Sequence, residues 1–596
     1  MPQLRATLPE WNLDDLYRSL DDPAIETDLA EALRRAEGFE KAFRGRITDA
    51  SIAPDTLHEA LGELEFIHEL KDRLLSYAYL LFAGDTSNPR HGAFMQKVQE
   101  RCTAINRHLI FFELEWINLA DDRASLLIKD PLLDRYRHYL ENERRYRPHR
   151  LSEGEETILG DKADTGKNAF VRLFEEQLSG ISLSLETGGE SRKTSMEEAL
   201  SLLYDADREM RASAAKAITA GLKENSRVLS YIFNVLVQDH ASDDRLRSFP
   251  DPMSSRHMAN EIDGGTVRVL LDCCRSNYTL VARYYALKRR ILGLDRVYDY
   301  DRYAPVAADT KAFGFEEARE TVLSSFSRFS PDMAATAKQF FDKRWIDAAL
   351  RPGKRGGAFS HPVVPSVHPY ILVNYTGRQR DVMTLAHELG HGVHQCLAAK
   401  QGYFHSQTPL TTAEMASVFG EMLVFHSLKE RETDPKARLA LLCGKIEDTI
   451  ATVFRQVALT TFEEALHRAR REEGELPPDR INGLWLEANR AMFGDSVALT
   501  DDYSCWWLYI SHFIHAPFYC YAYAFGELLV MALYRRYLEE GAPFVPRYLA
   551  LLESGGRDSP DRLLNSIGVN ILDPGFWQGG VDIIAKMVAE AEQLAQ

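Results

Sequence analysis

The sequence of 596 residues lacks the features that mark several common classes of protein. It has only seven cysteines, an odd number with no C-x-x-C pair, so neither a disulfide framework nor a thiolate zinc site is indicated. No run approaches the ~18 unbroken apolar residues of a membrane span, and no apolar signal segment follows Met1. The net charge of −17 argues against a nucleic-acid-binding surface. We therefore expect a cytoplasmic protein without nucleic-acid or membrane partners.

Most of the chain has the apolar periodicity of helices. Near residues 176–198 the pattern changes to polar–apolar alternation around Gly188-Gly189, which predicts a short hairpin. Residues 352–373 are rich in proline and glycine and predict short strands and turns, and the helical pattern resumes after Asp381. The sequence thus predicts a mainly α fold with a small β element.

A metal-binding pattern, H-E-x-x-H, lies at the start of the second helical stretch. On a helix, His387 and His391 are one turn apart on the same face and can aim both imidazoles at one point. Zinc accepts such ligands and keeps one position open for water when it is catalytic, and Glu388 is placed to act as a general base on that water. A random chain of this size contains the pattern roughly once in twenty-five to thirty cases, so the context has to support it.

The surrounding helix gives that support. Asp381 is placed to cap its start, and the apolar residues between Asp381 and His391 give it a buried face. Gly390 and Gly392 are unusual in a helix, where each costs about 1 kcal/mol relative to alanine. A closely packed neighbour would explain both glycines.

A third ligand is required, and His394 does not qualify. It lies two turns from His387, roughly 10 Å along the axis, which is too far for both to share one ion. A following helix offers Glu414 and Glu421, which share a face but are seven residues apart. One of these carboxylates is expected to bind the ion, and the other to orient a ligand histidine by a hydrogen bond.

The stretch from His387 to Glu421, H-E-L-G-H-x-x-H followed by A-E-M-A-S-x-x-x-E, resembles the thimet-type oligopeptidases, and most closely their oligoendopeptidase F branch. The opening L-P-E-W-N-L-D-D-L-Y, the segment G-A-F-S at 357–360 and P-Y-I-L at 369–372 resemble the same branch, so the similarity covers essentially the whole chain. The resemblance implies one Zn²⁺ per chain held by His387, His391 and Glu414, with Glu421 orienting a ligand. It also implies a deep channel for unstructured oligopeptides. The change of pattern at the expected hairpin marks the predicted boundary between an N-terminal region over 1–190 and a catalytic region over 191–596.

A second segment, H-F-I-H-A-P-F-Y-C-Y-A-Y at 512–523, carries histidines and tyrosines. Pro517 suits the first turn of a helix, with both histidines in a preceding loop, and Tyr519 and Tyr523 then share a face. By itself the segment is typical of an aromatic core. The resemblance instead implies that His512 and the two tyrosines stabilise the oxyanion of peptide hydrolysis, and His515 is a further candidate for substrate contact.

Gly356, Gly357 and Ala358 precede an expected strand that could pair with a substrate backbone, although a simple turn into the strand fits equally well. The basic residues Arg351, Lys354 and Arg355 around the start of this stretch could receive a substrate carboxylate, but a solvated loop is the more common role of such a run.

The predicted function is that of a zinc metalloendopeptidase acting on short oligopeptides. Two alternatives remain open at this point. One is a zinc exopeptidase with the same ligands, and the other is a zinc-containing peptide-binding protein without activity. The intact Glu388 argues against the second, because a structural zinc site needs no base.

Overall fold

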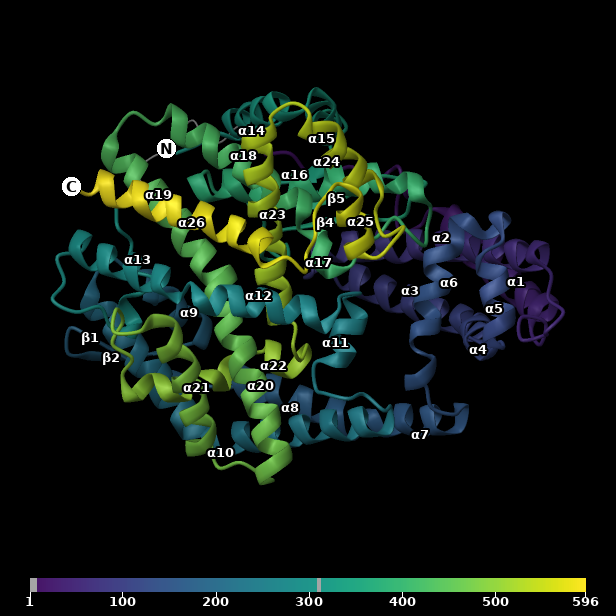
Figure 1. Ribbon diagram of the computed structural model, residues 1–596, viewed down its shortest axis with the longest axis horizontal. Helices are drawn as coiled ribbons and strands as arrows, with labels where there is room; N and C mark the ends of the chain where they lie inside the picture. The colour runs from purple at the N-terminus through teal and green to yellow at the C-terminus, as the bar shows by residue number, and fades with distance from the viewer. Residues whose placement is uncertain (1–7, 308–311) are drawn as a thin grey trace. The chain divides into compact units, whose positions relative to one another are not determined.

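The computed structural model describes residues 8–307 and 312–596, and helices make up most of this part of the chain (Figure 1). The few strands form two small sheets, one of two strands and one of three. The predicted mainly α fold with a small β element is therefore confirmed.

Many helices begin at a proline that follows a small polar residue. At α1 (Pro23–Phe43) the Asp22 carboxylate accepts a hydrogen bond from the Ala24 amide at 3.0 Å. At α3 (Pro89–Arg107) the Asn88 side-chain oxygen accepts a hydrogen bond from the Arg90 amide. Proline is favoured here because its fixed φ suits the first turn and its missing N–H would have no helical partner.

Two compact units divide the chain, and each is assembled from three separate segments. Unit 1 comprises Met1–Arg147, Asp309–Arg431 and Arg536–Asn570. Its further helices and its strands are α2 (Pro54–Gly84), α4 (Phe111–Asn118), α5 (Asp121–Ile128), α6 (Arg137–Arg145), α14 (Phe315–Phe329), α15 (Pro331–Asp342), β3 (Ile346–Asp347), β4 (Phe359–His361), β5 (Tyr370–Leu372), α16 (Gln379–Ala398), α17 (Leu410–Ala413), α18 (Met415–Arg431), α24 (Phe544–Glu553) and α25 (Pro560–Ser566).

The three-stranded sheet of unit 1 lies against α16, as Figure 1 shows for β4 and β5. Its strand order is β3-β5-β4, with β3 parallel and β4 antiparallel to β5. Ser360 of β4 is opposite Ile371 of β5, which is fully buried. Since β4 pairs only with β5, it is an edge strand within the described residues.

Unit 2 comprises Pro148–Ala308, Glu432–Arg535 and Ile571–Gln596. Its elements are α7 (Glu153–Ala163), α8 (Lys167–Ser179), β1 (Leu183–Thr187), β2 (Glu190–Thr194), α9 (Met196–Ser201), α10 (Arg208–Leu246), α11 (Ser254–Ala259), α12 (Gly264–Ser276), α13 (Tyr278–Ile291), α19 (Pro435–Thr449), α20 (Arg455–Glu473), α21 (Pro478–Phe493), α22 (His512–His515), α23 (Cys520–Glu540, of which Arg536–Glu540 belong to unit 1) and α26 (Pro574–Leu594). A buried apolar cluster joins α8, β1, α10, α20, α21 and the residues that lead into α22.

The predicted hairpin is confirmed. β1 and β2 pair antiparallel from Leu183 opposite Thr194 to Thr187 opposite Glu190, and the turn contains Gly188 and Gly189, both with positive φ. The boundary at residue 190 falls inside this hairpin, and it stays a prediction.

The search for membrane-crossing segments gives a negative result. Within residues 8–307 and 312–596, no helix combines the length and the hydropathy that a membrane crossing requires.

Candidate metal centre and tyrosine segment

The helix α16 presents His387 and His391 one turn apart, as the motif predicts. Asp381 contributes to its start, but from inside the helix, because α16 begins at Gln379. The Asp381 carboxylate accepts hydrogen bonds from the amides of Thr376 at 2.7 Å and Arg378 at 3.0 Å. The predicted capping residue is therefore correct, while its position is the third residue of the helix.

Glu414 completes a cluster of three possible metal ligands in unit 1. It lies in the turn between α17 and α18, and its Oε2 is 3.3 Å from His387 Nε2 and 3.4 Å from His391 Nε2. One ligand atom from each of the three residues lies within 4.8 Å of the others, and no other group of this kind occurs in the described part of the chain. Two imidazole nitrogens and a carboxylate oxygen are a donor set that zinc accepts.

Glu421 and His394, the other two residues considered as ligands, lie where the spacing predicts. Glu421 Oε2 lies 3.5 Å from His387 Nδ1, on the side of the ring away from Glu414. His394 is buried but does not belong to the three-residue group, and its Nε2 has no hydrogen-bond partner. The helix therefore places His391 beside Glu414 and leaves His394 outside the group of possible ligands.

Burial and neighbouring charges set the protonation of these groups. Burial raises the pKa of Glu388 to about 7. The charge of His387 and a hydrogen bond from the backbone of Ser360 in β4 act in the opposite direction and lower this pKa. Burial lowers the pKa of His391 to about 4, so its imidazole is neutral at pH 7. Burial also acts to lower the pKa of His387, but Glu421 and Glu414 outweigh it and raise that pKa to about 9. The neighbouring carboxylates therefore outweigh burial at His387 but not at His391.

Ser417 is a site residue that the sequence analysis did not identify. Its hydroxyl donates to Glu414 Oε2 at 2.7 Å, which holds the carboxylate toward the histidines. It is the serine of the A-E-M-A-S stretch, three residues after Glu414, and the i,i+3 spacing at a helix start was the available signal.

Gly356, Gly357 and Ala358 lie directly before β4 and outside the strand itself. Gly357 has a φ of +80°, which favours glycine, and a Cβ on either glycine would meet no atom within 4 Å. The turn into a strand is therefore present, and it leaves open space beside the edge strand.

Two of the three basic residues before this turn, Arg351 and Lys354, bind a buried carboxylate, which is neither of the roles that the sequence suggested. Arg351 donates to both carboxylate oxygens of Asp347, at 2.9 and 2.6 Å, and Lys354 donates to Asp347 Oδ1 at 2.7 Å. The side chains of Asp347 and Lys354 are buried, and Arg351 is paired with the same carboxylate, so neither cation is free to receive a substrate carboxylate. Arg355 is exposed, as a solvated loop predicts. A buried carboxylate requires such partners, and the sequence around Arg351 gave no sign of it.

In unit 2, His512 and the tyrosines form a cluster of their own. His512 Nε2 lies 3.2 Å from the Tyr523 hydroxyl, and the ring centroids of Tyr519 and Tyr523 are 4.9 Å apart. Burial lowers the pKa of His512. Tyr521 points elsewhere, as predicted, and its hydroxyl accepts from Asn260 Nδ2 at 2.9 Å.

The expected helix start at Pro517 is wrong. His512–His515 form the short helix α22, and α23 begins at Cys520. Phe518 has a φ of +58°, a left-handed conformation that interrupts the helix after Pro517. His515 is exposed, and its Nε2 lies 3.4 Å from Glu175 Oε1 on α8.

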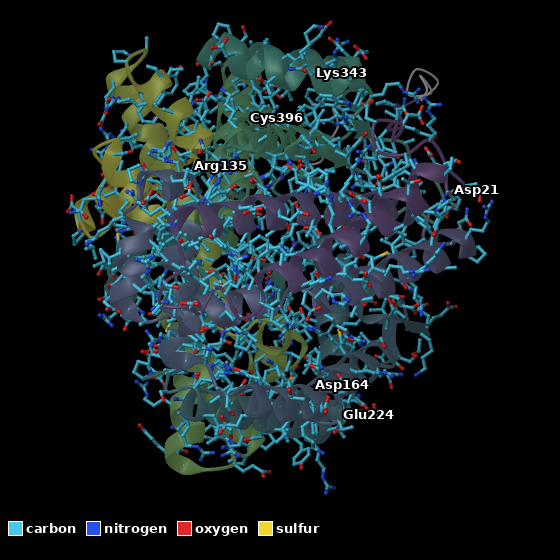
Figure 2. All side chains as sticks on the ribbon, turned by 90° about the vertical axis from the view of Figure 1, so that its right-hand side faces the viewer. Asp21, Arg135, Asp164, Glu224, Lys343 and Cys396 are labelled. Atoms are coloured by element: carbon cyan, nitrogen blue, oxygen red, sulfur yellow. The ribbon has the colours of Figure 1, made fainter. Side chains whose placement is uncertain are left out.

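The cysteines offer no alternative nucleophile. All seven are free thiols, and burial raises the pKa of Cys396 of α16, a residue labelled in Figure 2, to about 12. Burial likewise raises the pKa of Cys273 and of Cys505 to about 11. A thiol needs a lowered pKa to act as a nucleophile at neutral pH, which argues against a cysteine peptidase.

Comparison with known proteins identifies the class. The model of "Peptidase family M3" matches residues 201–582, and that of "Oligopeptidase F" matches residues 115–182. Oligopeptidase PepF of Bacillus subtilis is 27% identical over 98% of this chain and 87% of the relative. Group B oligopeptidase PepB of Streptococcus agalactiae is 24% identical over 98% of this chain and 97% of the relative.

Solved structures agree on the fold. A protein from Chlamydophila abortus matches with a TM-score of 0.87 at 24% identity, covering 98% of both chains. Oligoendopeptidase-F from Enterococcus faecium matches with a TM-score of 0.70 at 21% identity, covering 95% of this chain and 97% of the other. The chain therefore belongs to peptidase family M3. Within it, the chain is an oligoendopeptidase F member and a metallopeptidase, as the resemblance predicted.

Proposed function

We propose that the protein is a zinc-dependent endopeptidase that cleaves short, unstructured peptides. The observation that carries this proposal is the convergence of His387, His391 and Glu414 beside Glu388 on the same helix. Two imidazoles, which bind a metal ion in their neutral form, and one carboxylate fit Zn²⁺. Three protein ligands leave the fourth position for water and substrate. Glu421 at His387 Nδ1 would fix the orientation and tautomer of that ring.

A zinc ion held there would supply Lewis acidity to the scissile carbonyl and to a water molecule. Glu388 would take a proton from that water and return it to the leaving amine. A general base works best when its pKa is near the working pH, and burial raises the pKa of Glu388 to about 7. Glu388 is only 6% exposed, and this burial is the main cause of its raised pKa.

The substrate backbone would pair with the outer edge of β4. Among the described residues nothing pairs with the outer edge of this strand, and Gly356 and Gly357, next to Ala358, leave room for a peptide to approach closely. The Ser360 backbone reaches toward Glu388, so a peptide along this edge would bring a carbonyl near the base. Backbone pairing requires an extended peptide, which agrees with an oligopeptide substrate.

His512, Tyr519 and Tyr523 would stabilise the oxyanion. Their side chains are grouped within unit 2, where the His512 imidazole and the Tyr523 hydroxyl are within hydrogen-bonding distance. A donor aimed at a developing oxyanion contributes about 10²–10³-fold to kcat. His515, on the same short helix, would contact the substrate rather than the reacting carbonyl.

The decisive experiment is cleavage of an internally quenched peptide, blocked at both ends, by the wild type and by Glu388→Gln, with zinc content measured on both. We expect the wild type to cut, and the variant to keep its zinc while losing about 10²–10⁴-fold in kcat. A variant that cuts like the wild type would exclude Glu388 as the base. If both bind zinc and neither cuts, cleavage of free-ended peptides would indicate an exopeptidase, and no cleavage would indicate a peptide-binding protein.

A further inference from the structure

The residue before Tyr519 has an unusual backbone conformation. Phe518 is fully buried and has a φ of +58°, and only four other non-glycine residues in the described ranges share a positive φ. The left-handed conformation is unfavourable for a bulky side chain, so the surrounding structure has to impose it. The turn that contains Phe518 joins α22, which carries His512, to α23, which carries Tyr523.

One peptide group in this turn is held at both of its polar atoms. The Phe518 N–H donates to Glu463 Oε1 of α20 at 2.9 Å, and Arg256 Nε of α11 donates to the Pro517 carbonyl at 3.0 Å. These two atoms belong to the same amide, between Pro517 and Phe518. The amide therefore cannot rotate without breaking one of the two contacts.

Further contacts restrain the residues on either side of this amide. The Phe518 ring packs on His467 of α20, with centroids 4.7 Å apart, and on His240 of α10, with centroids 5.9 Å apart. Tyr521, between Tyr519 and Tyr523, is anchored by Asn260 and by His257, whose Nδ1 is 3.0 Å from its hydroxyl. Arg256, His257 and Asn260 are thus three closely spaced residues that all bind one segment.

Fold stability alone explains Glu463 poorly. It is 1% exposed, and its Oε2 has no hydrogen-bond partner among the residues that the structure describes. An unpaired buried oxygen costs folding free energy, which offsets part of the stability that the hydrogen bond to the Phe518 amide provides. What the carboxyl group provides is a fixed acceptor for the Phe518 amide.

We propose that Glu463 and Arg256 are positioning residues that act through the Pro517–Phe518 amide to fix Tyr519 and Tyr523 for catalysis. The proposal rests on the oxyanion role proposed above for these tyrosines. Preorganised donors keep their effect only if they are held to within a fraction of an ångström. Neither residue touches the substrate in this account; each acts through the turn.

The test compares Glu463→Leu, which removes the acceptor, with Glu463→Gln, which keeps an amide oxygen in its place. We expect Glu463→Leu to lower kcat by about 10–100-fold with KM changed less than about twofold, because misplaced groups affect the transition state more than ground-state binding. Glu463→Gln should stay within about threefold of the wild type. Arg256→Met should behave like Glu463→Leu.

A matched control comes from Asn234 of α10, which is also buried in unit 2 and holds another backbone segment. Its side chain donates to the Leu476 carbonyl and accepts from the Leu476 amide, at 2.9 and 2.8 Å. Asn234→Leu should lower the melting temperature and leave kcat unchanged. A similar fall in kcat for Asn234→Leu and Glu463→Leu would overturn the proposal.

A double-mutant cycle identifies the route of the effect. In a Tyr519→Phe/Tyr523→Phe background, Glu463→Leu should have little further effect on kcat, because the groups it positions have been removed. Full additivity would overturn the positioning role, as would an unchanged kcat in Glu463→Leu. If the tyrosine variants themselves cut like the wild type, the proposed oxyanion role fails, and this outcome is separate from failure of the positioning role.

Discussion

Gly390 of α16 lies so close to Ala416 of α18 that a Cβ on the glycine would be 2.3 Å from the Ala416 carbonyl oxygen. The neighbouring Gly392 has a similar constraint, since its Cβ would be 2.5 Å from the Phe340 ring. The closely packed neighbours that the sequence predicted for both glycines are therefore confirmed. The close crossing of α16 and α18 brings Glu414 to the histidines of α16, so it determines the geometry of the metal centre.

Substituting Gly390 should therefore damage the metal centre as well as the fold. Gly390→Ala places a methyl group against backbone that cannot rotate away, and we expect a loss of about 3 kcal/mol or more in the free energy of unfolding. The helices must also separate, so zinc affinity should fall. Urea unfolding and zinc titration measure the two effects.

Gly444 provides the control for that substitution. It lies within α19, and a Cβ there would meet no atom within 4 Å. Gly444→Ala should raise the free energy of unfolding by up to about 1 kcal/mol, because alanine favours the helix. Equal destabilisation by Gly390→Ala and Gly444→Ala would contradict the packing argument.

Two histidines one turn apart on α16 should differ sharply when replaced. His391→Ala removes a proposed ligand and should abolish stoichiometric zinc binding, whereas His394→Leu should leave the zinc content unchanged. The reason is that His394 lies outside the three-residue cluster, although it is more deeply buried than His391. The measurement is the zinc content of both purified variants. Loss of zinc from both would show that His394 also contributes to the metal centre.

The Glu421 carboxylate should affect zinc binding without touching the ion. Removing a group that orients a ligand histidine typically costs 10–100-fold in metal affinity or activity, and we expect Glu421→Ala to fall in that range. Competition with a zinc chelator of known affinity measures it. An unchanged affinity would mean that the 3.5 Å approach to His387 Nδ1 has no orienting effect.

The sequence predicted the features that depend on nearby residues and missed those that depend on distant ones. The two histidines of α16 and the turn at Gly188-Gly189 follow from local spacing. The partners of Asp347 and the left-handed Phe518 depend on side chains that the fold brings together, such as Glu463, 55 residues away in sequence. No local pattern reports such contacts, and for this reason the sequence wrongly predicts a helix start at Pro517.

The pH dependence of stability gives a final prediction, which concerns Glu463 alone. Burial raises the pKa of Glu463 to about 8, against the hydrogen bond from the Phe518 amide and the charge of Arg256. The nearby His467 stays neutral, because burial lowers its pKa well below the usual value.

In the unfolded chain, Glu463 has an ordinary pKa of about 4.5. Between this value and about 8, the folded protein keeps the proton and the unfolded chain releases it. Stability due to this group is therefore fully present below about pH 4.5 and is lost as the pH rises toward about 8. Glu463→Gln cannot ionise, so the wild type should lose stability relative to it between pH 6 and pH 9. Urea unfolding of both zinc-loaded proteins at pH 6 and pH 9 measures the difference in their free energies of unfolding. The contributions of all other titrating groups cancel in this difference. A constant difference would show that Glu463 is already ionised in the folded protein at pH 6.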